Sequence, residues 1–106
     1  MLSAGCVPIA SADPSTVPVG LALAANDSEF IPATLVAPAR MPVTVMFQNY
    51  SNEPHTLIFL EPISVNPEQV VEPGQSLTVA FSTPAAGEYT FLCNVHEGMT
   101  GTLRIN

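Results

Sequence analysis

The sequence predicts an all-β fold, a Greek-key β-sandwich of about seven or eight short strands. Three observations lead to this expectation. Apolar residues alternate with polar or small ones in short runs, which is the period of half-buried strands. Turn-forming Asn, Asp, Pro and Gly residues separate the runs. No segment shows a helical stripe, and the 11 prolines would interrupt most helices.

The expected strands follow one another at short intervals along most of the chain. In the first, Val19, Leu21 and Leu23 alternate with small residues. The second is interrupted by Pro32, which lacks an amide proton and therefore suits an edge strand. The later segments repeat the same alternation, and their short spacing favours antiparallel pairing. The expected strands cover residues 19–25, 30–36, 43–48, 55–59, 76–82, 89–94 and 103–105.

The connections between the strands are also visible in the sequence. Turn signals lie at Asn26-Asp27, Pro73-Gly74 and Ala86-Gly87. The stretch 64–72 lacks a clear period and contains a proline, so we expect an irregular crossover there.

The chain divides into a short N-terminal part and one domain. Residues 1–16 are small, contain prolines and have no period, which is typical of a flexible linker, and the domain is expected to span residues 17–106. Small residues precede Cys6, as at the end of a bacterial lipobox. We therefore expect Cys6 to carry a lipid anchor in a longer precursor, the alternative being an ordinary tail cysteine. Because Cys6 lies in this tail, we expect no disulfide with Cys93.

Composition excludes several classes of function. The net charge is −7, and Arg40 and Arg104 are the only basic side chains apart from the two histidines. A nucleic-acid-binding protein would need a basic footprint, and so would a protein that docks electrostatically on anionic lipid. No apolar run is long enough to span a membrane, and a complete signal peptide is not seen. A protein partner with a basic face remains compatible with this charge.

The end of the chain contains a cluster of metal-binding side chains. Cys93, His96 and Met99 stand three residues apart and offer a thiolate, an imidazole and a thioether. Sulfur ligands together with imidazole favour copper over hard cations such as magnesium. In a strand register, Cys93 shares the inward face of Tyr89 and Phe91, where a thiolate needs a compensating charge such as a metal ion.

A fourth ligand is available from another strand. His55 is the only other histidine of the chain and lies on the inward face with Leu57 and Phe59. In a sandwich this strand can lie beside the one that ends at Cys93. Gly98 and Gly101 are expected to give the connecting turn its freedom, so that the loop ligands return to the same point.

Each of these residues also has an ordinary structural interpretation. A lone cysteine on a strand is more often a small core residue, and a lone methionine more often fills a gap. Single histidines are usually hydrogen-bonded or exposed. The joint spacing in this strand context nevertheless indicates a metal site rather than four unrelated residues.

The motif Pro54-His55, followed by Cys93-x-x-His96-x-x-Met99, resembles the cupredoxin family in its short-loop, amicyanin-like form. The resemblance covers residues 19–106. It implies a cupredoxin-like sandwich that holds one type 1 copper ion, cycling between Cu(I) and Cu(II), through His55, Cys93, His96 and an axial Met99. Supporting segments are Phe30-Ile31-Pro32, Phe47-Gln48-Asn49, Pro73-Gly74-Gln75-Ser76, Ala86-Gly87-Glu88-Tyr89-Thr90-Phe91 and Gly98-Met99-Thr100-Gly101-Thr102-Leu103.

The resemblance also implies a function, which is one-electron transfer between redox partners without enzymatic activity. His96 would be the electron port, with an apolar rim that includes Pro54, Val95, Gly98 and Pro73. The expected partners are redox proteins, such as a cytochrome c or a membrane or periplasmic oxidoreductase. We expect a monomer in the periplasm or on the extracellular face of the cell membrane.

A second function would use the same four ligands. The protein could bind and deliver copper in the periplasm or at the cell surface. A copper carrier often has extra donors, whereas Met41 and Met46 form no Met-rich run here. Two histidines are too few for a multicopper oxidase, and one cysteine in the loop is too few for a dinuclear copper centre. Electron transfer is therefore favoured.

Two departures from the family pattern produce further expectations. Thr56 follows the first histidine where relatives often have Asn, and Val95 stands where short-loop relatives often have Pro. We expect backbone N–H groups of both residues to donate to the Cys93 sulfur. We also expect the Thr56 hydroxyl to replace the tie that Asn makes between loops.

Overall fold

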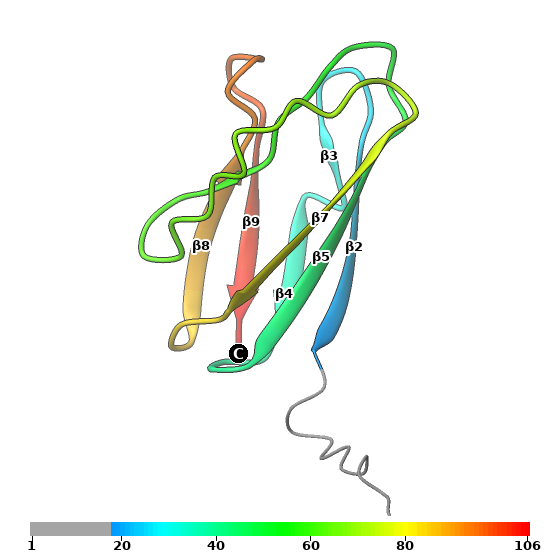
Figure 1. The fold of residues 1–106 in the computed structure, drawn as a ribbon. Helices are drawn as coiled ribbons and strands as arrows, with labels where there is room; N and C mark the ends of the chain where they lie inside the picture. The colour runs from blue at the N-terminus through cyan, green and yellow to red at the C-terminus, as the bar shows by residue number, and fades with distance from the viewer. Residues whose placement is uncertain (1–17) are drawn as a thin grey trace, which may run out of the picture.

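The computed structural model describes residues 18–106, which form two four-stranded sheets packed face to face (Figure 1). In spatial order, the first sheet contains β3 (Phe30–Ile31), β2 (Val19–Ala25), β5 (Pro42–Asn49) and β7 (Ser76–Ser82). The second contains β4 (Thr34–Ala37), β9 (Thr100–Ile105), β8 (Gly87–Leu92) and β6 (Ile58–Phe59). The described residues contain no helix, so the expected all-β sandwich is confirmed. A helix long and apolar enough to cross a membrane is accordingly not found between residues 18 and 106.

The sheets are mixed rather than purely antiparallel. Strands β2 and β5 run parallel, with Leu21 opposite Val45, and β4 and β9 are parallel as well. The pairs β2–β3, β5–β7, β6–β8 and β8–β9 are antiparallel, as expected. The parallel pair β2–β5 arises because the chain passes through β3 and then β4 of the opposite sheet before it returns alongside β2.

The segment around Pro32 forms two edge strands instead of one. Residues Phe30–Ile31 lie at the edge of the first sheet, and Thr34–Ala37 lie at the edge of the second. Pro32 stands between them, where its missing N–H costs no ladder hydrogen bond. The expectation of an edge position is confirmed, but the chain changes sheets at this proline, which the alternation alone did not indicate.

The core lies between the sheets and reaches up to the ends of β5 and β8. Along β5, Val43, Val45 and Phe47 are buried while the residues between them are more exposed, as the alternation predicts. The Phe30 and Phe91 rings pack edge to face with centroids 5.0 Å apart. This packed layer forms the floor beneath the end of the sandwich where β5 and β8 finish.

The irregular crossover expected over residues 64–72 is present, and two backbone bridges attach it to the sandwich. It contains no named strand, but isolated bridges join Val65 to Phe59 and Val71 to His55. It therefore returns the chain to the end of the sandwich that holds His55. The linker expected over residues 1–16, together with Cys6, lies outside the described residues.

Candidate metal centre

Cys93 is placed at the end of the sandwich by strand β8. It follows directly after Leu92, the last residue of that strand, and continues the inward face of Phe91. Its side chain is buried, with 3% of its surface exposed. The predicted inward register of Cys93 is therefore confirmed.

The loop after Cys93 folds back on itself within seven residues. The Cys93 amide donates to the Met99 carbonyl at 3.0 Å, and the Met99 amide donates to the His96 carbonyl at 3.4 Å. Gly98 has a φ of 79°, a left-handed conformation that favours glycine and closes the turn as expected. Met99, which directly precedes β9, is buried, with 2% of its surface exposed.

Gly101 has a different role from the one expected. It lies in β9 opposite Phe91, and a Cβ atom built there would overlap the Phe91 ring. Gly101 is therefore required for close packing beneath the loop, and it gives the turn no freedom.

His55 reaches the same point from the other side of the crossover. Its backbone pairs with Val71 in both directions, at 3.0 and 2.7 Å, which fixes the position of the residue. Its side chain is fully buried and lies on the inward face with Leu57 and Phe59, as expected. The imidazole is therefore held inside the protein before any ligand arrives.

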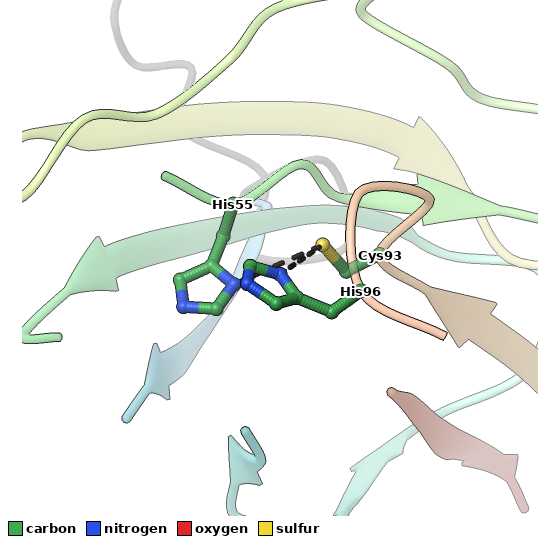
Figure 2. A group of neighbouring side chains, drawn as sticks. All are labelled: His55, Cys93 and His96. Carbon is green, nitrogen blue, oxygen red and sulfur yellow. Dashed lines mark hydrogen bonds between the residues drawn. The ribbon is translucent and has the colours of Figure 1, made fainter. Parts of the chain in front are cut away.

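The structure brings Cys93 and both histidines together (Figure 2). Their donor atoms lie within 4.8 Å of one another. The Cys93 sulfur is 3.8 Å from Nδ1 of His55 and 3.7 Å from Nδ1 of His96. Nitrogen and sulfur ligands of one transition-metal ion, with bond lengths of about 2.0 and 2.3 Å and a trigonal angle, would be about 3.7 Å apart. Both sulfur–nitrogen distances therefore match those of a trigonal metal site.

The environment of Cys93 favours its thiolate form. Burial alone raises the pKa of the Cys93 thiol, but hydrogen bonds from the Thr56 amide, from His96, from His55 and from the Thr56 hydroxyl outweigh it. Together they lower the pKa from 9.0 to about 6. A metal ligand must be deprotonated, so the site is prepared electrostatically for a cation.

Thr56 links the two segments that carry the ligands. Its amide donates to the Cys93 sulfur at 3.4 Å, as expected. Its hydroxyl accepts from the Asn94 amide at 3.0 Å and donates to the Asn94 side-chain oxygen at 2.8 Å, which is the expected tie between loops. The bond expected from the Val95 amide to Cys93 is not found among the described residues, so the sulfur has one backbone donor there instead of two. The exposed Val95 side chain instead faces solvent.

Sequence reasoning missed the polar partners on the far side of each imidazole. His55 Nε2 lies 2.9 Å from the Ser51 hydroxyl, and His96 Nε2 lies 2.6 Å from a Glu53 carboxylate oxygen. Hydrogen bonds to Cys93 and then to Glu53 raise the pKa of His96. Both partners come from the turn before Pro54, and polar residues in a turn are too common to be singled out from sequence.

Comparisons with known proteins agree with this architecture. A family model for the cupredoxin-like domain matches residues 3–105. A solved structure of reduced auracyanin from the photosynthetic bacterium Roseiflexus castenholzii is 19% identical, with a TM-score of 0.70 over 85% of this chain and 98% of that one. Auracyanin A, a "blue" copper protein from Chloroflexus aurantiacus, is 21% identical, with a TM-score of 0.71 over 85% of this chain and 100% of that one.

A purple cupredoxin from Nitrosopumilus maritimus is similar as well, at 16% identity and a TM-score of 0.64 over 81% of this chain and 99% of that one. Comparison with curated sequences gives no significant match. At these identities the solved structures support the fold, and the argument for chemistry depends on the residues of the site.

Proposed function

The chain belongs to the cupredoxin-like domain family, and from this premise we propose that it is a type 1 (blue) copper protein that carries single electrons between redox partners and is not an enzyme. One observation carries the proposal. A cysteine sulfur and two imidazole nitrogens, from segments about forty residues apart in sequence, lie within 4.8 Å of one another at the end of the sandwich.

The ligands of the proposal are those expected from the sequence. Cys93 Sγ and the Nδ1 atoms of His55 and His96 would hold the copper ion, and the buried Met99 would be the fourth, thioether donor. Bound copper supplies a one-electron couple between Cu(I) and Cu(II). Two sulfur and two imidazole donors suit copper better than a hard cation, so the donor set fits this metal.

The protein's own contribution is to hold these side chains still and keep water away. His55, Cys93 and Met99 are each at most 3% exposed, so the interior of the site is closed to solvent. The Val71 bridge fixes His55, and the Thr56–Asn94 hydrogen bonds fix the start of the ligand loop. A closed and rigid site has little to rearrange when its charge changes, which suits electron transfer.

His96 offers the route to the surface. It is the one member of the proposed set with appreciable exposure, at 24% of its side chain. Pro54, Val95 and Gly98 are exposed, and their positions beside the ligands in sequence make them candidates for an apolar contact surface. Pro73, the fourth expected member of this rim, is exposed as well.

Charge is distributed unevenly along the sandwich, which supports a basic partner such as a cytochrome c. Glu53 and Glu97 are exposed at the end that holds the ligands. Arg104 lies near the far end of β9, where it pairs with Glu88 at 3.3 Å, and Arg40 precedes the far end of β5. With a net charge of −7, the ligand end would attract a cationic protein surface.

The location follows from the sequence rather than from the fold. We place the protein in the periplasm or on the extracellular face of the cell membrane, with a lipid anchor on Cys6 of a longer precursor. The support is the run of small residues that precedes Cys6. The expected monomer and the expected linker over residues 1–16 belong to the same proposal.

The structure favours electron transfer over copper delivery as the function. A delivery protein must let the acceptor's ligands reach the ion, which is easiest when the donors are exposed. Three of the four proposed ligands here are almost fully buried, and His96 offers only part of its ring. An electron can leave through that ring edge, whereas a copper ion would need the loop to open.

Electron transfer can be tested by mixing the protein in its Cu(I)-loaded, reduced form with an oxidised, basic c-type cytochrome. Mixing the two in a stopped-flow instrument should give second-order reduction of the cytochrome, with a rate that falls steeply as ionic strength rises. If the cytochrome were reduced equally fast at all ionic strengths, the proposal of a basic partner would be contradicted. If neither this cytochrome nor another protein acceptor were reduced, and copper instead passed rapidly to a chelator, delivery would be favoured.

A further inference from the structure

One short turn reaches the far nitrogen of both imidazoles. Ser51 contacts Nε2 of His55, and Glu53 contacts Nε2 of His96, while both Nδ1 atoms face Cys93. The two contacts differ in kind. Ser51 is buried and neutral, whereas Glu53 is charged and its side chain is 54% exposed.

The backbone of Glu53 is held firmly although its side chain is exposed. Asn49 is fully buried at the end of β5, and its side-chain nitrogen donates to the Glu53 carbonyl at 2.8 Å. The Ser51 hydroxyl accepts from the Glu53 amide at 3.1 Å. The same Asn49 side chain also donates to the Val71 carbonyl at 2.8 Å, which ties the turn to the bridge behind His55. Hydrogen bonds therefore hold both the amide and the carbonyl of Glu53, so the backbone that carries its carboxylate is fixed.

The contact between Glu53 and His96 joins two segments that are far apart in sequence and that Thr56 and Asn94 also tie together. His96 lies in the loop after β8, 43 residues from Glu53, and the Oε1–Nε2 distance is 2.6 Å. Nδ1 is turned toward the sulfur, and a proton on Nε2 can be donated to the Glu53 carboxylate. A carboxylate behind a metal-binding histidine fixes the ring orientation and makes its other nitrogen a better ligand. An exposed imidazole without such a partner would be free to rotate about its side-chain bonds.

We propose that Glu53 is a positioning residue that holds the His96 ring with Nδ1 facing the Cys93 sulfur. The proposal rests on the function proposed above only for the identity of the ion. The position of the ring is a property of the chain and can be measured without metal. Glu53 gives the partly exposed histidine the fixed orientation that burial gives to His55.

The test is the mobility of the two imidazole rings, measured by ¹³C relaxation on histidine-labelled protein. The chain has only two histidines, so the spectrum contains two ring systems. In the metal-free protein, the His96 ring should be nearly as rigid as the His55 ring. In Glu53→Ala, the His96 ring should become mobile while His55 is unchanged. Glu53→Gln keeps an oxygen acceptor and should retain most of the rigidity.

Glu97→Gln is the matched control because it removes one negative charge from the residue next to His96. Glu97 has no described hydrogen bond to that ring, so the ring should stay rigid in this variant. In the copper-loaded protein, Glu53→Ala should speed copper release to a chelator by about tenfold or more, and Glu97→Gln should not.

The outcomes separate the two proposals. Equal His96 mobility in the wild-type protein and in Glu53→Ala would overturn the positioning role, whether or not copper binds. The same loss of rigidity in Glu97→Gln would also overturn it, because the effect would then be one of charge. Failure of the wild-type protein to bind copper would overturn the proposed function, while the ring measurement would still decide the role of Glu53.

Discussion

The two histidines of the proposed site are held by different physical means. His55 lies inside the sandwich, fully buried, bridged through its backbone to Val71 and capped by the neutral Ser51 hydroxyl. His96 lies in a loop, is partly exposed, and is capped by the Glu53 carboxylate. We call these the inner side and the loop side of the site.

The difference follows from the cost of burying charge. A carboxylate in the place of the Ser51 hydroxyl would lose its water, whereas a hydroxyl can be satisfied by neighbours within hydrogen-bond distance. On the loop side, solvent remains in contact with Glu53, so a charged partner costs little there. The inner side therefore depends on packing, and the loop side depends on charge and on a short, closed turn.

The largest expected effect is at Gly101, which packs against the buried Phe91 ring. In Gly101→Ala, the new Cβ overlaps the Phe91 ring, which is buried and has nowhere to move. We expect unfolding by denaturant to show a loss of about 3 kcal/mol or more. Gly20→Ala is the control, because its Cβ would meet only the flexible end of Met46 at 3.4 Å. Gly98→Ala should cost about 1–2 kcal/mol, because only the loop conformation is strained. Similar losses at Gly101 and Gly20 would refute the packing argument.

The second prediction concerns the ionisation of Cys93, whose sulfur lies between the two histidines. In metal-free protein carrying Cys6→Ser, only Cys93 can contribute thiolate absorbance in the ultraviolet. Its pKa is lowered to about 6, so this absorbance should rise with pH around that value instead of near 9.0. The pKa shifts downward because burial, which raises it, is outweighed by the hydrogen bonds that favour the thiolate form. A midpoint at or above 9.0 would mean that burial dominates.

The third prediction separates the inner side from the loop side by stability. Ser51→Ala leaves the buried His55 Nε2 without this partner and removes one of the two hydrogen bonds to the Asn49 side-chain oxygen, so it should lower the free energy of unfolding by about 1–3 kcal/mol. Glu53→Ala removes a partly exposed contact and should lower the free energy of unfolding by less than Ser51→Ala does. Ser28→Ala, at an exposed position, is the control for the loss of a serine hydroxyl. If Glu53→Ala proved the more destabilising of the two, the contrast drawn above would be wrong.

The smallest expected effect is at the tie between the two sides. Thr56→Val removes the hydroxyl that bonds Asn94 and should cost about 1 kcal/mol, measured by denaturant unfolding of the metal-free protein. Thr56→Asn should recover most of the loss, because its side chain can bond across the same gap. Thr90→Val on the exposed face of β8 should change little. Equal effects at Thr56 and Thr90 would show that the tie contributes nothing.

The sequence predicted the features that depend on periodicity and ligand chemistry. The alternation along β5 and β8 gave the inward faces, including that of Cys93, and the ligand spacing identified the three donors that converge. It did not predict the parallel pairs or the change of sheet at Pro32, because pairing depends on contacts distant in sequence. The Ser51 and Glu53 contacts were missed for the same reason, since neither residue type nor spacing indicates which polar turn residue will meet a ring.

The central claim is that four side chains bind one copper ion at the end of the sandwich. The most direct measurement is a titration of metal-free protein with Cu(II), followed by visible absorption, in the Cys6→Ser background. The account predicts an intense thiolate-to-copper band that saturates at one equivalent and is absent when Cys93→Ser is added. A colourless product at one equivalent, or an equal band in the Cys93→Ser variant, would contradict it.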